Sequence, residues 1–239
     1  MASTRAVHKP IRMQGSKGQA NIPTYADPSQ PSTYDESFGF STEFVSVIHG
    51  KYEHGGSSHA TLLLLDFKVP SSAPNGQRYY TAFVSVEFTK ADASDSSPVV
   101  TKLEPFGERT YDGQAITIGA LGVGSGFRHK TSDERTRLKG EFQTTAATAE
   151  RVRNAAKWIF SDNPDTQDGI PTSLRAAILV KTPTTKFNAH FHFQAKVQSE
   201  RVSHADFVET FGTGKPIVSG VHVQNLDANN MLAFDLKSL

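Results

Sequence analysis

The segment Phe187–Val197 constrains the fold more than any other, because its side chains alternate strictly between apolar and polar types. Successive side chains of a strand point to opposite faces of a sheet, so this pattern is typical of a half-buried strand. Before it come the apolar run 177–180 and the turn-forming residues 181–185. We therefore predict a β-hairpin over residues 175–197, with both strands packed on a core.

A second segment, residues 78–90, alternates in the same way. It predicts a strand whose core-facing side chains are Tyr80, Ala82, Val84, Val86 and Phe88. Shorter apolar runs bounded by turn residues predict further strands at residues 41–49, 60–69, 99–106, 151–160, 216–224 and 231–236, with Trp158 buried.

Residues 114–127 are unusually rich in glycine and are expected to pair with the charged segment 134–145. A single short helix is expected near residues 203–211, where Val202, Ala205, Val208 and Phe211 recur every third position. The fold class that follows is all-β: a two-layer antiparallel β-sandwich with that one helix.

The chain of 239 residues has the size of one large β-domain or of two small ones. Residues 1–37 begin with basic side chains and continue with proline, serine and aspartate, which predicts a flexible or loosely docked arm. We expect residues 38–239 to form a single domain.

Composition narrows the classes of function. The absence of cysteine excludes disulfides, thiolate metal sites and a cysteine nucleophile. Without a segment of signal-peptide length or an apolar run that could form a transmembrane helix, we expect a cytoplasmic protein. The net charge of +1 is not the strong signal expected of a nucleic-acid binder. No nucleotide-binding loop or nucleophile elbow is present, so we expect no cofactor.

The candidate metal ligands are histidines. His190 and His192 lie on one face of the predicted strand, with their Cα atoms about 6.5–7 Å apart. His222 is the best candidate for a third ligand. The alternative is that these imidazoles are ordinary polar groups on the solvent face.

A second candidate site is basic. Between residues 128 and 157 there are eight basic side chains against four acidic ones. The excess is suited to binding anionic lipid, RNA or an acidic partner, or else it is an ordinary solvated surface. The candidate ligand-binding residues are Arg128, Arg135, Arg137, Arg151 and Arg153.

One part of the chain resembles a known pattern. Residues 153–158 (Arg-Asn-Ala-Ala-Lys-Trp), the turn 161–164 (Ser-Asp-Asn-Pro) and residues 169–181, which begin Gly-Ile-Pro, resemble uncharacterised intracellular proteins of filamentous fungi. In that family the turn carries glutamate-asparagine, whereas here it is Asp162-Asn163. The resemblance covers about thirty residues. It implies a fungal source and a β-rich fold, and it supplies no catalytic residues.

The sequence leaves four hypotheses of function. The first is a non-catalytic intracellular protein that binds a partner or assembles into a homo-oligomer, since the glycine-rich strand lacks the charges that normally protect a sheet edge. The second is a membrane-acting or pore-forming protein that inserts residues 113–145. The third is a cofactor-free or metal-dependent enzyme with a histidine-lined pocket. The fourth is a capsid-like protein with residues 1–18 as a basic arm.

Overall fold

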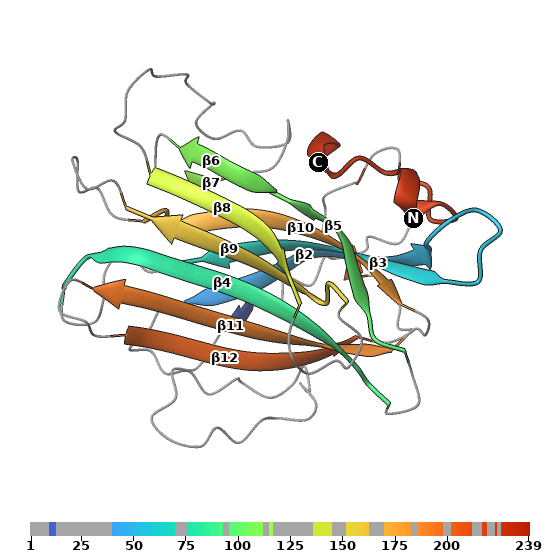
Figure 1. The fold of residues 1–239 in the computed structure, drawn as a ribbon, viewed down its shortest axis with the longest axis horizontal. Coiled ribbons are helices and arrows are strands. Elements are labelled where there is room, and N and C mark those ends of the chain that lie inside the picture. The colour runs from blue at the N-terminus through green and yellow to red at the C-terminus, as the bar shows by residue number, and fades with distance from the viewer. Residues whose placement is uncertain are drawn as a thin grey trace, which may run out of the picture.

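The protein is a sandwich of two β-sheets (Figure 1). The computed structural model describes residues 10–12, 40–69, 76–92, 96–111, 115–116, 136–144, 152–162, 170–182, 186–197, 202–211, 217–218, 223 and 226–239. All of its strand pairs are antiparallel except β7 with β10. The all-β sandwich expected from the sequence is therefore confirmed.

The seven-stranded sheet has the order β1-β2-β3-β10-β5, with β13 paired to β2 and β7 paired to β10. Its strands are β1 (Pro10–Arg12), β2 (Ser41–Lys51), β3 (His59–Lys68), β5 (Val99–Glu104), β7 (Ala115–Ile116), β10 (Ser173–Thr182) and β13 (Ile217–Val218).

The six-stranded sheet has the order β12-β11-β4-β9-β8-β6. Its strands are β4 (Tyr79–Lys90), β6 (Gly107–Tyr111), β8 (Thr136–Gln143), β9 (Ala155–Ser161), β11 (Phe187–Val197) and β12 (Val202–Phe211). The chain passes from one sheet to the other between β5 and β6, through Pro105.

Aromatic side chains fill the space between the sheets. Phe40 stacks on Phe193 with ring centroids 3.9 Å apart, and Phe67 packs against Trp158 at 5.8 Å. Trp158 is fully buried, as predicted, and its indole N–H donates a 3.0 Å hydrogen bond to the carbonyl of Pro105. Gly140 lies beside this carbonyl, where a Cβ atom would collide with it. The glycine thus lets the β5–β6 connection approach β8.

A second apolar layer covers the outer face of the seven-stranded sheet. Leu62 and Leu64 point into it, while Leu63 and Leu65 point into the main core, so this leucine run is buried on both faces. The cover is the C-terminal strap, residues 226–239, which contains the 3₁₀ turns η1 (Met231–Ala233) and η2 (Leu236–Ser238). Figure 1 shows both turns beside the seven-stranded sheet.

The strap is tied to the sheet by polar contacts. The Lys102 ammonium donates to the carbonyls of Leu232 (2.5 Å) and Phe234 (2.7 Å). The backbone N–H of Leu232 donates to Tyr52, and that of Lys51 donates to Ala228. The strand predicted at residues 231–236 was therefore wrong, because this segment forms tight turns that bury Met231, Phe234 and Leu236 and leave Leu232 and Ala233 exposed.

The predicted hairpin over residues 175–197 was also wrong. Its two strands exist, but β10 pairs with β3, β5 and β7, whereas β11 pairs with β4 and β12 in the other sheet. The burial pattern gives the reason: residues 176–180 of β10 are all buried, so this strand needs cover on both faces. In β11, buried residues alternate with residues that are at least partly exposed, so this strand needs cover on only one face.

The helix expected near residues 203–211 is instead strand β12, which pairs with ten consecutive residues of β11. An apolar residue at every third position fits a helix, but this segment also contains valine, threonine and phenylalanine, which favour strands. The long exposed edge of β11 supplies the hydrogen-bonding partner. The pairing with β11 therefore determines the structure of this segment, and the helical spacing of its apolar residues does not.

Two smaller expectations need correction. β8 is flanked by β6 and β9, and β7 pairs with β10, so the described parts of residues 113–145 do not form the predicted pair with each other. In β4, Tyr79 is buried and Tyr80 is 39% exposed, the reverse of the expectation. An irregularity in the pairing with β11, between Lys196 and Val197, shifts the alternation there.

In the part of the chain that the structure describes, no helix has the length and apolar character needed to cross a bilayer.

Candidate functional site: the open face of the six-stranded sheet

The two outer faces of the sandwich differ. The C-terminal strap covers that of the seven-stranded sheet, whereas no described element packs on that of the six-stranded sheet. We call the latter the open face and define it by the outward side chains of four strands. These are Arg137, Lys139, Glu141 and Gln143 of β8, Lys157, Ile159 and Ser161 of β9, Thr81, Phe83, Ser85, Glu87 and Thr89 of β4, and Asn188, His190, His192, Gln194 and Lys196 of β11.

A row of cationic and aromatic groups crosses the centre of the open face. The Lys157 ammonium lies over the Phe83 ring, 4.3 Å from its centroid, and the His192 ring lies 5.4 Å from the same ring. Register places Ser85 between Lys157 and His192. Because serine is small, side chains from the two flanking strands can lean towards Phe83. Three adjacent strands thereby hold one preorganised cation–aromatic row.

Glu141 of β8 is in register with Lys157 and lies at one end of this row. Lys139 bonds it at 2.8 Å, and the Gln143 amide donates to its other carboxylate oxygen at 3.2 Å. The hydrogen bond from Lys139 lowers the pKa of Glu141 and raises the pKa of Lys139, and the charge of Lys157 adds to the effect on Glu141. The carboxylate is therefore already engaged, which leaves Arg137, Lys157 and Lys196 as the remaining cations of the face.

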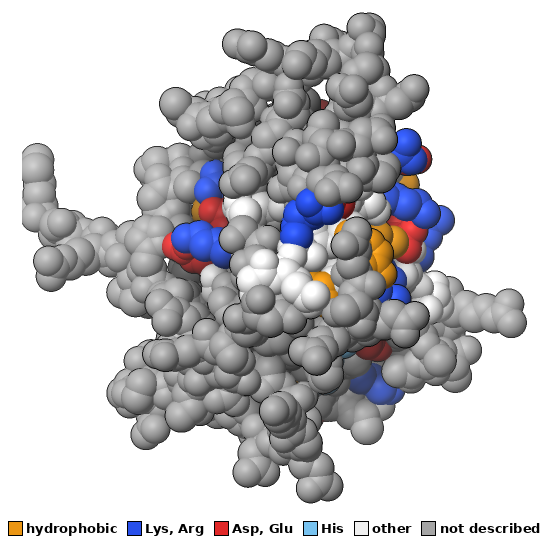
Figure 2. Space-filling view, turned by 90° about the vertical axis from the view of Figure 1, so that its left-hand side faces the viewer, with side chains coloured by type: hydrophobic (Ala, Val, Ile, Leu, Met, Phe, Trp, Pro, Cys, Tyr) orange, Lys and Arg blue, Asp and Glu red, His pale blue; other side chains and the backbone are white. Residues whose placement is uncertain are grey.

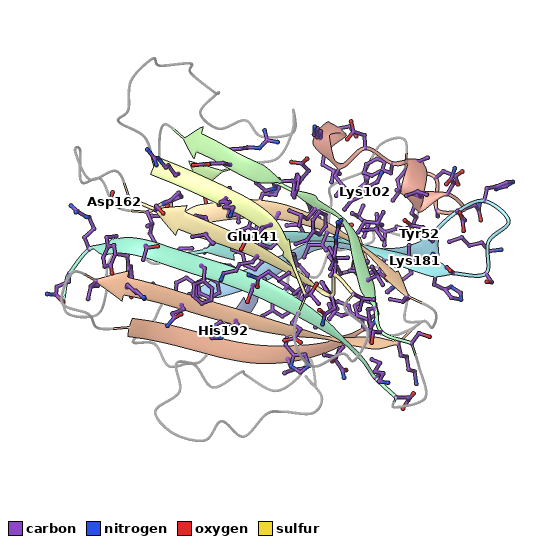
Figure 3. The ribbon with its side chains drawn as sticks, viewed as in Figure 1. Tyr52, Lys102, Glu141, Asp162, Lys181 and His192 are labelled. Atoms are coloured by element: carbon purple, nitrogen blue, oxygen red, sulfur yellow. The ribbon has the colours of Figure 1, made fainter. Side chains whose placement is uncertain are left out.

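The two candidate metal ligands of β11 do lie on one face. His190 shares a 3.0 Å hydrogen bond between its Nε2 and the Thr89 hydroxyl, and His192 packs on Phe83. Both rings thus lean towards β4. Figure 3 labels His192 on β11. His222 lies outside the described residues, and those residues contain no group of three or more potential ligands that could hold a metal ion. The three-histidine site stays a prediction.

The candidate arginines divide into two groups. Arg137 is exposed on β8, and Arg153 is exposed just before β9, with its guanidinium 5.2 Å from the centroid of the Phe142 ring. Arg128, Arg135 and Arg151 lie outside the described residues. Figure 2 shows one end of the molecule, where basic and acidic side chains lie next to one another around a small apolar area.

Two further polar groups have structural explanations. The Arg175 guanidinium bonds the Asp66 carboxylate twice, at 2.6 Å each, across the β10–β3 pair. This pairing raises the pKa of Arg175. His49 shares a 2.9 Å hydrogen bond with the Thr61 hydroxyl, and burial lowers its pKa. Both arrangements join neighbouring strands of the seven-stranded sheet.

Sequence reasoning missed several residues of the candidate site. Lys139, Glu141 and Lys157 were counted only as charges, because nothing in the sequence shows that β8, β9 and β4 are neighbours. Phe106, which is 50% exposed, was also missed. Its place between Pro105 and Gly107 was the available signal, since such residues mark a turn at the surface.

Comparisons with known proteins define no family for this chain. No protein-family model matches it, and no curated protein matches it in sequence. Solved structures that align with it include Clostridium perfringens delta-toxin, with 12% identity over 73% of this chain and 79% of the toxin, at a TM-score of 0.36. The membrane-inserted form of the NetB toxin of the same species aligns with 10% identity over 74% of this chain and 86% of the toxin, at 0.33.

A third aligned structure is the cohesin module of the family 33 glycoside hydrolase of C. perfringens ATCC13124. It has 6% identity over 71% of this chain and 96% of the module, at a TM-score of 0.32. Scores this low transfer no function. The membrane-acting, metal-dependent and capsid-like hypotheses remain predictions, because residues 117–135, His222 and most of residues 1–18 lie outside the described part of the chain.

Proposed function

We propose that this chain is a non-catalytic binding protein and that the open face binds an acidic protein partner. The observation that carries the proposal is the contrast between the two outer faces. One is apolar and covered by the chain's own strap, whereas the other presents charged and aromatic side chains with no described element over it. A rigid sheet with one chemically varied face that no described element covers is a suitable scaffold for a binding surface.

The charge of the open face favours an acidic partner. It carries four basic side chains (Arg137, Lys139, Lys157 and Lys196) against two acidic ones. Lys139 and Glu141 form an ion pair, which leaves Arg137, Lys157 and Lys196 against Glu87, whose carboxylate accepts a hydrogen bond from the Asn154 amide at 3.5 Å. A partner carboxylate would therefore meet a surface with an excess of positive charge. Complementary charge of this kind accelerates association and selects partners.

The aromatic groups complement the charges. Phe83 lies between Lys157 and His192 and is only partly buried, so part of its ring is available to a partner. Aromatic residues are enriched in protein interfaces. The same proposal places the protein in the cytoplasm, which its lack of cysteine supports.

A charge-neutralising pair of variants tests this proposal. A fluorescent poly-L-glutamate peptide is titrated with the wild type and with the double variant Lys139→Gln/Lys157→Gln, and binding is followed by fluorescence anisotropy. The matched control is Lys51→Gln/Lys68→Gln, which removes the same charge from exposed positions on the seven-stranded sheet.

We expect the open-face variant to weaken binding by roughly threefold or more, and the control to change it little. Equal effects of the two double variants would show that only net charge matters and would contradict the proposal. Binding to phosphatidylserine vesicles without binding to the peptide would instead favour a lipid surface.

A further inference from the structure

The open face has an apolar centre. Ile159 of β9 and Phe83 of β4 are directly opposite each other in the strand register, and both side chains point outwards. Each is only partly buried, so an apolar surface is exposed in the middle of an otherwise polar face. An apolar side chain of a partner would be buried here against two side chains that the sheet already holds in place.

Two cations lie on one side of this apolar pair. The register places Arg137, Ser161, Thr81 and Lys196 in one row across β8, β9, β4 and β11. With strands about 4.8 Å apart, the Cα atoms of Arg137 and Lys196 are about 14 Å apart. Both side chains are exposed, and no described carboxylate forms an ion pair with either of them.

The residues between these two cations leave room for an anion. Ser161 and Thr81 are small, and the Thr81 hydroxyl donates a 2.9 Å hydrogen bond to the carbonyl of Phe160. The long side chains of Arg137 and Lys196 can therefore extend over the middle of the row. A carboxylate held there would accept hydrogen bonds from the guanidinium fork and from the ammonium.

A third cation lies on the other side of the apolar pair. Lys157 precedes Ile159 by two residues on β9, so its side chain points to the same face. Its neighbour on β8, Glu141, is already bonded by Lys139 at 2.8 Å. Lys157 and Ser161 are separated along β9 by about 13 Å. Two positively charged positions thus flank the apolar pair, one on each side along the strands.

This spacing matches that of an extended peptide. In an extended chain the side chains of residues i, i+2 and i+4 share a face and follow one another about every 6.6 Å. An apolar residue at i+2 would then lie on Ile159 and Phe83, with residues i and i+4 over the two positively charged positions. A helix fits less well, because its residues i and i+7, which share a face, are only about 10.5 Å apart.

We propose that the open face binds an extended partner segment of the pattern acid-x-apolar-x-acid, where x is any residue. The carboxylate at one end bonds Arg137 and Lys196, and the carboxylate at the other end meets Lys157. The proposal rests on the binding function proposed above and adds the sequence pattern of the partner. Because the pattern reads the same in both directions, it holds for either direction of the bound segment.

Two peptides of equal composition test the pattern. The first, Gly-Ser-Asp-Ser-Leu-Ser-Asp-Ser-Gly, has the proposed spacing, whereas the second, Gly-Ser-Asp-Asp-Leu-Ser-Ser-Ser-Gly, has both aspartates on one side of the leucine. Each carries a fluorophore and is titrated with wild-type protein at low salt, and anisotropy is measured. We expect the first peptide to bind roughly fivefold more tightly, because only it can occupy both positively charged positions. Equal binding of the two peptides would overturn the proposed pattern.

Variants of the protein locate the peptide on the face. Arg137→Gln/Lys196→Gln should abolish the advantage of the first peptide, because one positively charged position is lost. The matched control is Arg153→Gln/Lys68→Gln, which removes an exposed arginine and an exposed lysine outside the open face and should leave the advantage unchanged. Equal effects of these two double variants would overturn the proposal.

The apolar contact has its own test. Ile159→Thr keeps a β-branched side chain, which suits a strand, and removes part of the apolar surface. It should weaken binding of the first peptide and leave unchanged the weaker binding of the same peptide with serine in place of leucine. Equal effects on both peptides would show that the apolar residue does not contact Ile159.

Poly-L-glutamate separates this proposal from the function on which it rests. If Lys139→Gln/Lys157→Gln weakens binding of poly-L-glutamate while the two aspartate peptides bind equally, the open face binds acidic partners without regard to spacing, and only the pattern is wrong. If neither poly-L-glutamate nor either peptide binds, both proposals are wrong.

Discussion

At the scale of single residues, Trp158 contacts both the opposite sheet and the β5–β6 connection, one of several places where the chain passes between the sheets. Its ring packs on Phe67 of the opposite sheet, and its indole N–H bonds the Pro105 carbonyl of the β5–β6 connection. The same carbonyl approaches Gly140 so closely that a side chain there would collide with it. One large residue and one residue without a side chain thus fix the corner that positions Phe106 and Arg153.

Replacing Trp158 with alanine should lower the free energy of unfolding by about 3–5 kcal/mol, because it leaves a cavity and an unpaired carbonyl. Trp158→Phe, which keeps a ring but loses the N–H, should cost less. Urea denaturation of both variants measures this. An unchanged midpoint for Trp158→Ala would contradict the position of this residue in the core.

His49 makes stability depend on pH in a predictable direction. Burial lowers its pKa below the ordinary value of 6.5, so below about pH 6.5 the unfolded chain binds more protons than the folded one. The contribution of His49 is therefore present above pH 6.5 and is lost as the pH falls through the folded pKa. His49→Gln should reduce the loss of stability between about pH 7 and pH 5. Denaturation at both pH values checks this, and an identical pH dependence in variant and wild type would contradict it.

At the scale of elements, the sequence predicted strands better than their partners. The alternation of β4 and β11 was sufficient to place most of their core-facing residues, because that pattern is local. Sheet membership is not local. The turn after β10 looked like a hairpin, but β10 needed cover on both faces and occupies the middle of the other sheet. The C-terminal strap was missed for the same reason, since its binding surface is formed by distant strands.

The strap depends on Lys102, whose ammonium bonds two of its carbonyls (Figure 3). Lys102→Met keeps most of the aliphatic stem and removes the charge, so we expect a loss of about 1–2 kcal/mol in unfolding free energy. Hydrogen exchange of residues 231–239 should also become faster. Lys68→Met, an exposed lysine at the end of β3, is the control and should leave both quantities unchanged. Unaltered exchange in Lys102→Met would show that the apolar contacts alone hold the strap.

At the scale of the whole molecule, the two outer faces have different roles in this account. The strap packs on one outer face, whereas no described element packs on the open face, where we propose that a partner binds. Sequence reasoning identified Arg137, His190 and His192, which lie on the open face, only as separate candidates. It did not show that Lys157, Phe83 and His192 form one row, because these side chains belong to strands separated by many residues. Their proximity is a consequence of topology.

The central claim is that the open face is the binding surface, and its most direct test is a map of the residues that a ligand affects. Isotope-labelled protein is titrated with poly-L-glutamate peptide, and chemical-shift changes are followed by NMR. This account predicts the largest changes at Lys139, Lys157, Phe83 and His192, with the strap residues 226–239 unaffected. Changes concentrated on the strap and the seven-stranded sheet, with the open face unperturbed, would contradict it.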